Sequence, residues 1–145
     1  MLKLDVGCGQ WKIDGYKGVD INPDSVADVV CDIDLGLPFP DNSTDAIYCS
    51  HFLEHTKNVL FILDEFYRVC INGSVIHIIV PLLEWHSEGH YNNFSPGWFH
   101  RFVDKNKFDI EHLSIIEKQV CIPILNPDVN SYFIFEKELK LTVKK

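Results

Sequence analysis

Two glycines and an aspartate near the start of the chain have the types and spacing of a nucleotide-type pocket. Gly7 and Gly9 follow an apolar run, and Asp20 ends a second such run eleven residues after Gly9. A strand that ends in glycines lets a ligand approach bare backbone, and an acid at the end of the next strand can hold ribose hydroxyls. These residues therefore predict a site for a ligand that contains a nucleoside.

The spacing opposes a dinucleotide. A dinucleotide fingerprint needs a third glycine three residues after the second, a helix whose amino end receives the pyrophosphate, and an acid about 20 residues on. Here Lys12 stands where the third glycine belongs, and residues 10–15 leave room for at most one helical turn. An NAD-linked enzyme is therefore disfavoured.

Two histidines farther along could supply a base. His86 and His90 lie in a polar, aromatic-rich segment that also holds Glu84 and Glu88. Histidine can accept a proton from an acceptor group, although a solvated loop with local hydrogen bonds is an equally good reading. A metal site built from these four residues is disfavoured, because Gly89 and its turn-forming neighbours oppose a helix with both histidines on one face. We expect no metal.

Short apolar runs predict the strands that must position these groups. Continuous runs of this kind are typical of parallel strands buried on both faces. Between the fourth and fifth run, residues 58–70 have helical spacing, with Asn72 and Gly73 as the predicted stop. Ser95 and Pro96 predict the start of a short helix. The runs occupy residues 2–6, 16–21, 27–31, 46–49 and 74–80.

The last part of the chain predicts an antiparallel pair of strands. Residues 108–120 and 132–143 alternate apolar and charged side chains, as in Phe135 and Leu139 against Glu136 and Glu138. Such alternation indicates one wet face. We expect a single α/β domain over residues 1–145.

Composition and charge narrow the classes of protein. The chain is 46% hydrophobic and 23% charged, and none of its apolar runs approaches the roughly 20 residues of a membrane span. Thirteen basic against twenty-one acidic residues give a formal charge of −8, which opposes an extended nucleic-acid surface. The five cysteines lie far apart, and there is no secretion signal, so we expect reduced thiols in a cytoplasmic protein.

An ordered set of motifs in residues 2–81 resembles the small S-adenosylmethionine-dependent methyltransferases of the Rossmann-like class, type 11-like. After the Gly-x-Gly turn come Leu-Pro-Phe-Pro-Asp-x-Ser at residues 37–43, Leu-Glu-His at 53–55 and Tyr-Arg-Val at 67–69. The resemblance implies a methyltransferase sheet with strand order 3-2-1-4-5-7-6, in which strand 7 is antiparallel. It implies S-adenosylmethionine as the cofactor.

The resemblance also assigns roles around the donor. Asp5, Gly7 and Gly9 would line its methionine part, and Asp20 would take both ribose hydroxyls. A carboxylate suits a vicinal diol because it accepts two hydrogen bonds at once. The alternative for Asp20 is a turn or capping role, since Asn22 follows closely.

For the adenine, the resemblance implies that Asp32 accepts from the amino group and that the Ile33 amide contacts the ring. Asp34 stands two residues after Asp32 and could take its place. The predicted donor-binding residues are Asp5, Gly7, Cys8, Gly9, Asp20, Ile21, Asp32, Ile33, Ser50 and His51.

The acceptor side is less determined. Ser50 and His51 end the fourth run, where a reversal of strand order opens a crevice. His55 could serve the site or merely pack the helix that follows. In the resembled subgroup a histidine precedes a Phe-Ser/Thr-Pro segment, which favours His90 over His86. The catalytic candidates are His90, His86 and His51, and the expected acceptor is a hydroxyl of a saccharide or small molecule.

The chain departs from the resembled pattern in its first part. The first run begins at residue 2, and residues 10–15 are too short for a regular helix, so two helical covers of the sheet are trimmed. The apolar surface thus exposed predicts a homodimer or an open groove for a bulky acceptor. The alternative function is a non-catalytic module that acts as a regulatory or interaction subunit.

Overall fold

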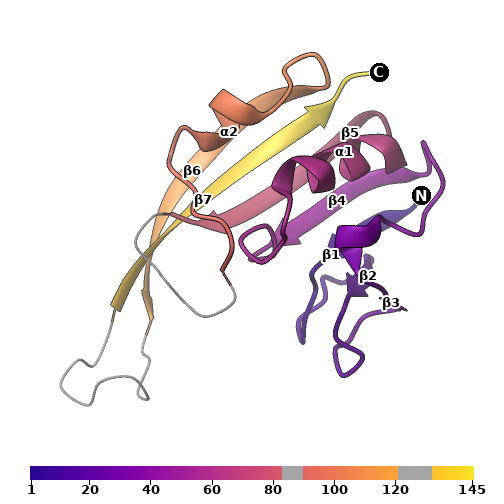
Figure 1. Cartoon of the computed structure of the whole chain (residues 1–145), viewed down its shortest axis with the longest axis horizontal. Coiled ribbons are helices and arrows are strands. Elements are labelled where there is room, and N and C mark those ends of the chain that lie inside the picture. The colour runs from indigo at the N-terminus through magenta and orange to yellow at the C-terminus, as the bar shows by residue number, and fades with distance from the viewer. Residues whose placement is uncertain (83–89, 121–131) are drawn as a thin grey trace.

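Seven strands form one mixed sheet in the order β3-β2-β1-β4-β5-β7-β6 (Figure 1). The computed structural model describes residues 1–82, 90–120 and 132–145. Strands β1 to β5 run parallel, β7 pairs antiparallel with β5, and β6 pairs antiparallel with β7, which confirms the predicted sheet. The strands are β1 (Lys3–Val6), β2 (Lys17–Asp20), β3 (Val29–Val30), β4 (Thr44–Ser50), β5 (Cys70–Pro81), β6 (Phe108–Val120) and β7 (Tyr132–Val143).

The first strand is enclosed by its neighbours in the sheet. β1 has β2 on one side and β4 on the other, so Val6 stands beside both Val19 and Cys49. Leu4 and Val6 have no exposed surface. A strand buried on both faces and paired at both edges needs the continuous apolar run that the sequence supplies.

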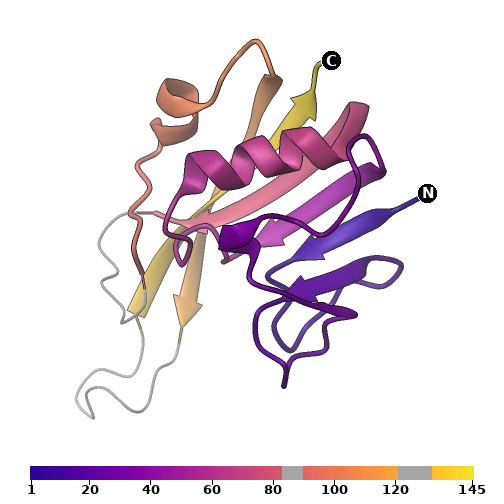
Figure 2. The same cartoon turned by 45° about the vertical axis from the view of Figure 1, so that its right-hand side comes forward.

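The helices lie on one face of the sheet, and α1 (Val59–Val69) crosses it as the main cover (Figure 2). The Asn58 side chain caps α1 by accepting a hydrogen bond from the Phe61 amide at 3.2 Å. Beside α1 lies η1 (Ile33–Leu35), a short 3₁₀ turn. None of the helices in the described part of the chain combines the length and apolar character that crossing a membrane requires. Five side chains of α1 are buried, namely Val59, Ile62, Leu63, Phe66 and Val69.

The predicted helix stop at Asn72 and Gly73 is wrong. α1 ends at Val69, Cys70 takes an extended conformation, and β5 begins there without a connecting turn. Cys70 pairs with Thr44 of β4, so strand pairing ends the helix and leaves both Asn72 and Gly73 inside β5.

The second helix, α2 (Trp98–Phe102), begins later than predicted. Gly97 stands at its cap position without a side-chain hydrogen bond, so neither Ser95 nor Pro96 opens it. The Ser95 carbonyl instead accepts from the Trp98 amide in the preceding turn. Aromatic packing places the helix, since the Phe99 ring stacks on Phe94 with centroids 5.5 Å apart.

The other face of the sheet carries no helix in the described part of the chain, and it is polar as well as apolar. Asp5, Tyr48, His77 and Lys140 stand side by side across β1, β4, β5 and β7. The ring of His77 meets Tyr48 edge-on and its Nε2 lies 2.5 Å from a carboxylate oxygen of Glu138. The face left open where the sequence predicts trimmed helices therefore carries charged and polar side chains beside apolar ones.

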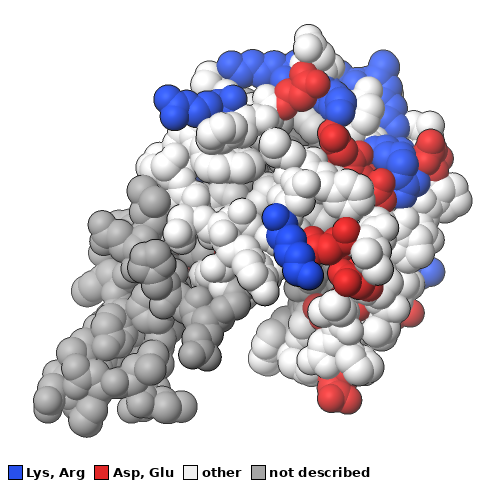
Figure 3. All heavy atoms as spheres, viewed as in Figure 1, with Lys and Arg blue, Asp and Glu red and all other residues white. Residues whose placement is uncertain are grey.

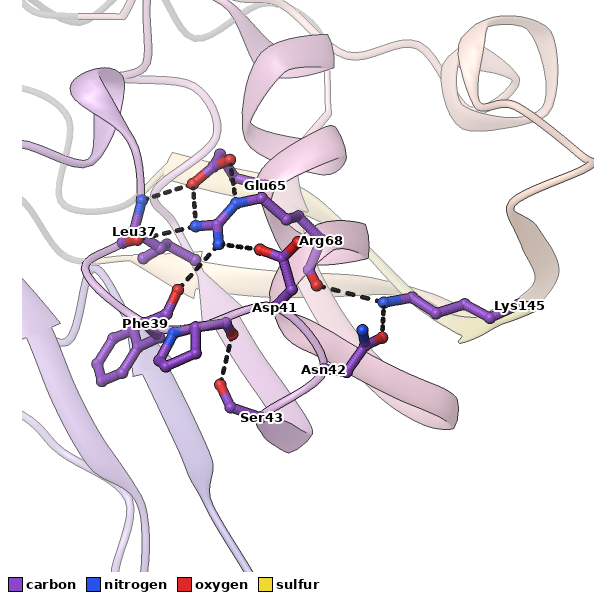
Figure 4. A network of polar contacts seen from close by, with 9 residues as sticks. Leu37, Phe39, Asp41, Asn42, Ser43, Glu65, Arg68 and Lys145 are labelled. Atoms are coloured by element: carbon purple, nitrogen blue, oxygen red, sulfur yellow. Dashed lines mark hydrogen bonds and ion pairs between the residues drawn. The ribbon is translucent and has the colours of Figure 1, made fainter.

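One arginine of α1 holds the loop that enters β4 (Figure 4). Arg68 donates to the carbonyls of Leu37 and Phe39, each at 2.9 Å, and to Asp41 at 2.7 Å. Glu65, one turn earlier, accepts from Arg68 and from the Leu37 amide, each at 2.7 Å. The guanidinium lowers the pKa of Glu65. The Leu-Pro-Phe-Pro-Asp and Tyr-Arg-Val motifs thus meet in one structural contact.

We expect Arg68→Ala to lower the free energy of unfolding by about 2–3 kcal/mol, because two loop carbonyls and two carboxylates lose a charged donor. Urea titration followed by circular dichroism measures the change. The control is Lys144→Ala, which removes an ion pair between Lys144 and Asp109 at the surface and should cost less than about 1 kcal/mol. Equal losses in the two variants would contradict the anchoring role.

Candidate functional site

The ends of the parallel strands meet around one cavity. Gly7 follows β1, Asp20 ends β2 and His51 follows β4, and parallel pairing brings all three to the same edge of the sheet. The cavity has a volume of about 340 Å³, within the usual range for small-molecule sites. Its lining consists of Gly7, Gly9, Asp20, Ile21, Asp32, Ile33, Asp34, His51, Phe52, His55 and Thr56.

The glycine turn is shaped by its own backbone and by a neighbour. Gly7 and Gly9 have φ angles of 74° and 53°, in the left-handed region that favours glycine. A Cβ atom on Gly7 would lie 2.6 Å from the Cβ of Phe52, whereas one on Gly9 would meet no atom within 4 Å. Gly7 is therefore required by strain and by close packing, and Gly9 presents bare backbone to open space.

Asp20 is held by backbone donors. The Gly9 amide donates to its Oδ2 at 2.8 Å and the Asn22 amide to its Oδ1 at 2.9 Å. The turn role that the sequence offered as an alternative is thus present. A carboxylate has roughly four acceptor positions, so each oxygen of Asp20 keeps capacity for a further donor from the cavity.

Three of the predicted donor-binding residues line a second cavity, of about 370 Å³, that shares Gly7 with the first. They are Asp5, Cys8 and Ser50. Asp5 is almost wholly buried and accepts from the Ile13 amide at 2.8 Å, and its burial raises its pKa. Burial likewise raises the pKa of the Cys8 thiol to about 11, which keeps it protonated and unsuited to nucleophilic attack.

The two aspartates at the expected adenine position, Asp32 and Asp34, make different structural contacts. Asp32 caps η1 by accepting from the Asp34 amide at 3.0 Å. Asp34 accepts from the Thr56 hydroxyl and from the Lys57 amide, and so ties η1 to the turn before α1. Both carboxylates border the cavity. Because the Asp34 carboxylate already accepts hydrogen bonds from Thr56 and Lys57, Asp32 is the better candidate for a ligand contact.

His51 lies between two buried carboxylates. Its φ angle of 53° is left-handed, which is uncommon for a residue with a Cβ atom. Its Nδ1 is 3.3 Å from Glu54 and its Nε2 is 3.0 Å from Glu136. The hydrogen bond with Glu54 raises the pKa of His51, and the charge of Glu136 adds to this. Because both ring nitrogens already face carboxylates, neither is directed at a substrate in the cavity, so the geometry favours a positioning role over a base.

The segment that contains His90 packs onto the turn between β4 and α1. The Tyr91 amide donates to the Glu54 carbonyl at 2.7 Å, and the Asn92 side chain donates to the Thr56 carbonyl at 2.6 Å. The ring of His90 then meets that of His55 edge-on, with centroids 4.7 Å apart. The sequence contained no spacing signal for this grouping, because its members are distant in the chain.

The remaining catalytic candidate, His86, lies outside the described residues. Of the predicted acceptor-side histidines, the structure therefore places His51 at the cavity and His90 behind His55.

We expect Gly7→Ala to lower the free energy of unfolding by about 2–4 kcal/mol, from left-handed strain and the clash with Phe52. The matched control is Gly15→Ala. Gly15 has a φ angle of 80° but no atom within 4 Å of its would-be Cβ, so this variant carries the strain alone, about 1–2 kcal/mol. Urea denaturation curves of both variants give the difference, and equal losses would show that Phe52 does not constrain the turn.

The chain matches a known family over half its length. The model of the family described as "Methyltransferase domain" matches residues 4–78. A curated relative, Uncharacterized protein MJ0638 from Methanocaldococcus jannaschii, is 33% identical over 88 residues, which are 60% of this chain. The matched region spans only 38% of that relative.

Solved structures share the whole fold. The YcgJ protein from Bacillus subtilis superposes with a TM-score of 0.77 at 14% identity, covering 99% of this chain and 91% of that one. A SAM-dependent methyltransferase from Methanosarcina mazei gives a TM-score of 0.66 at 17% identity, covering 99% and 92%. At these identities the likeness shows the fold alone.

Proposed function

Since the chain belongs to the methyltransferase-domain family, we propose that it binds S-adenosylmethionine and transfers the donor's methyl group to an acceptor. The observation that carries the proposal is Asp20, whose two oxygens are fixed by backbone amides beside a left-handed glycine turn at the rim of a cavity. A fixed carboxylate of this kind suits the vicinal diol of a ribose.

The two cavities suit the two parts of the donor. The adenosine part is proposed for the first cavity, where Asp20, Asp32 and Ile33 stand at successive positions along the edge. The methionine part is proposed beside Gly7, which lines both cavities, with Asp5 and Ser50 on the far side. A carboxylate at the methionine end, Asp5, also suits the ammonium charge that this part of the donor carries.

The donor supplies an electrophilic methyl group, and the chain supplies binding and orientation. Transfer needs a nucleophile in line with the methyl group, so positioning accounts for most of the rate enhancement. On the acceptor side, we propose a hydroxyl of a saccharide or small molecule. The candidate residues on this side are histidines. His51 and His55 line the first cavity, and His90 contacts His55. His51 follows β4, whereas Asp32 follows β3 at the far edge of the sheet.

Charge supports a small acceptor over a nucleic acid. Figure 3 shows Lys and Arg along the upper edge of the face in view, with Asp and Glu among them, and the described part of that face has no continuous basic band. A homodimer through the helix-free face remains part of the proposal. Sedimentation of the purified chain tests it, and a monomer at micromolar concentration would remove it.

A second candidate function is a non-catalytic module that keeps the fold as an interaction subunit. One observation favours it, namely the face of the sheet that no helix covers in the described part of the chain. Methyl transfer assays over a panel of hydroxyl acceptors discriminate the two functions. Donor binding without turnover on any acceptor would favour the module.

We expect wild-type protein to bind S-adenosylmethionine and its demethylated product in isothermal titration calorimetry. Asp20→Asn should weaken both by about 10-fold or more, since an amide cannot accept from two backbone donors and a diol at once. Asp24→Asn is the control, because Asp24 is exposed and does not line the cavity. Absence of binding at millimolar donor would refute the donor pocket.

A further inference from the structure

Three side chains from two distant segments converge next to the donor cavity. A carboxylate oxygen of Glu54, a ring nitrogen of His55 and a ring nitrogen of His90 all lie within 4.8 Å of one another. His55 also lines the cavity itself. A carboxylate with two imidazoles is a donor set that divalent transition metals prefer.

The carboxylate of this cluster is buried and only partly satisfied. Glu54 is 1% exposed. Its Oε1 faces Nδ1 of His51 at 3.3 Å, while its Oε2 has no hydrogen-bond partner among the described residues. Burying a carboxylate oxygen without a donor is costly, and a bound cation would remove that cost.

The backbone already holds His90 in place. The carbonyl of Glu54 accepts from the amides of Tyr91 and Asn92, at 2.7 and 3.1 Å. The Asn92 side chain adds bonds to the carbonyls of Leu53 and Thr56, at 3.1 and 2.6 Å. These four hydrogen bonds fix the two residues after His90 to the segment 53–56, which supplies both Glu54 and His55, so the backbone on both sides of the cluster is held without an ion.

We propose that Glu54, His55 and His90 bind one divalent transition-metal ion of the Zn²⁺ class. Tetrahedral coordination at about 2.0–2.2 Å places ligand atoms about 3.4 Å apart, so ligand atoms that now lie within 4.8 Å of one another must close by up to about 1.4 Å. His55 is exposed and His90 is half-buried, so both rings have room for a shift of this size. Three protein ligands leave a fourth position open, as in catalytic zinc sites.

Two neighbours complete the arrangement. His51 holds the other side of the Glu54 carboxylate, and Glu136 from β7 orients His51 through its Nε2 at 3.0 Å. Partners of this kind fix the ligands of metal sites and raise their affinity. This assignment differs from the expectation of no metal, which concerned His86 and His90 with two neighbouring glutamates; only His90 is common to both sets.

The consequence for chemistry rests on the proposed function. A cation beside the donor cavity would bind an acceptor through oxygen and lower the pKa of its hydroxyl. His90 would then act as a ligand in place of the base that the sequence predicts. The expected acceptor class is a hydroxyl that can reach the open metal position.

The test is metal binding by the full chain after removal of metals with a chelator. Titration calorimetry with ZnCl₂ should give one site per chain, and MgCl₂ should bind far more weakly because Mg²⁺ prefers oxygen ligands. His90→Ala and Glu54→Gln should each weaken Zn²⁺ binding by about 10-fold or more. Co²⁺ should give the visible absorption of four-coordinate cobalt in wild type and lose it in His90→Ala.

The control is His100→Ala, which removes an exposed histidine of α2 outside the cluster and should leave Zn²⁺ affinity unchanged. Absence of a Zn²⁺ site, or equal affinity in wild type, His90→Ala and Glu54→Gln, would overturn the proposal. Titration of the metal-free protein with S-adenosylmethionine keeps the two claims apart. Donor binding without Zn²⁺ binding refutes only the metal site, and Zn²⁺ binding without donor binding refutes only the donor pocket.

Discussion

Parallel pairing of β1 between β2 and β4 is the constraint on which the site depends. It forces the carboxyl ends of these strands to one edge, so Gly7, Asp20 and Ser50 become neighbours although the chain separates them. Gly7 then has to pass close to Phe52, and only a residue without a side chain can do so with a φ angle of 74°. The cavity follows from this geometry, because the segments that leave the ends of these strands form its walls.

A second set of contacts holds the segments between the strands in place. Arg68 fastens the loop before β4 to α1, and Asp34 fastens η1 to the turn before α1. In both contacts a charged side chain forms hydrogen bonds with backbone groups of loops, which have no partner in the sheet. The carboxylates of Asp5, Asp20 and Asp32 accept from backbone amides, whereas one oxygen of Glu54 has no hydrogen-bond partner among the described residues.

Much of the fold could be predicted because its signals are local. Apolar runs marked the five parallel strands, and alternation marked β6 and β7. The failures were at element ends. Gly73 reads as a helix stop, but pairing of Cys70 with Thr44 ends α1 earlier, and Pro96 reads as a first-turn residue, but aromatic stacking on Phe94 places the start of α2. Tertiary contacts override such weak local preferences.

By itself, the sequence determined where most strands lie along the chain, the glycine turn and the acid that follows it, because each depends on neighbouring residues; the order of the strands in the sheet came from the resemblance to a known family. Its spacing also disfavours a dinucleotide. Only the tertiary structure decided that the predicted donor residues divide between two cavities joined at Gly7, and that His90 stands beside Glu54 and His55. Those relations depend on backbone hydrogen bonds between distant segments, for which residue spacing carries no signal.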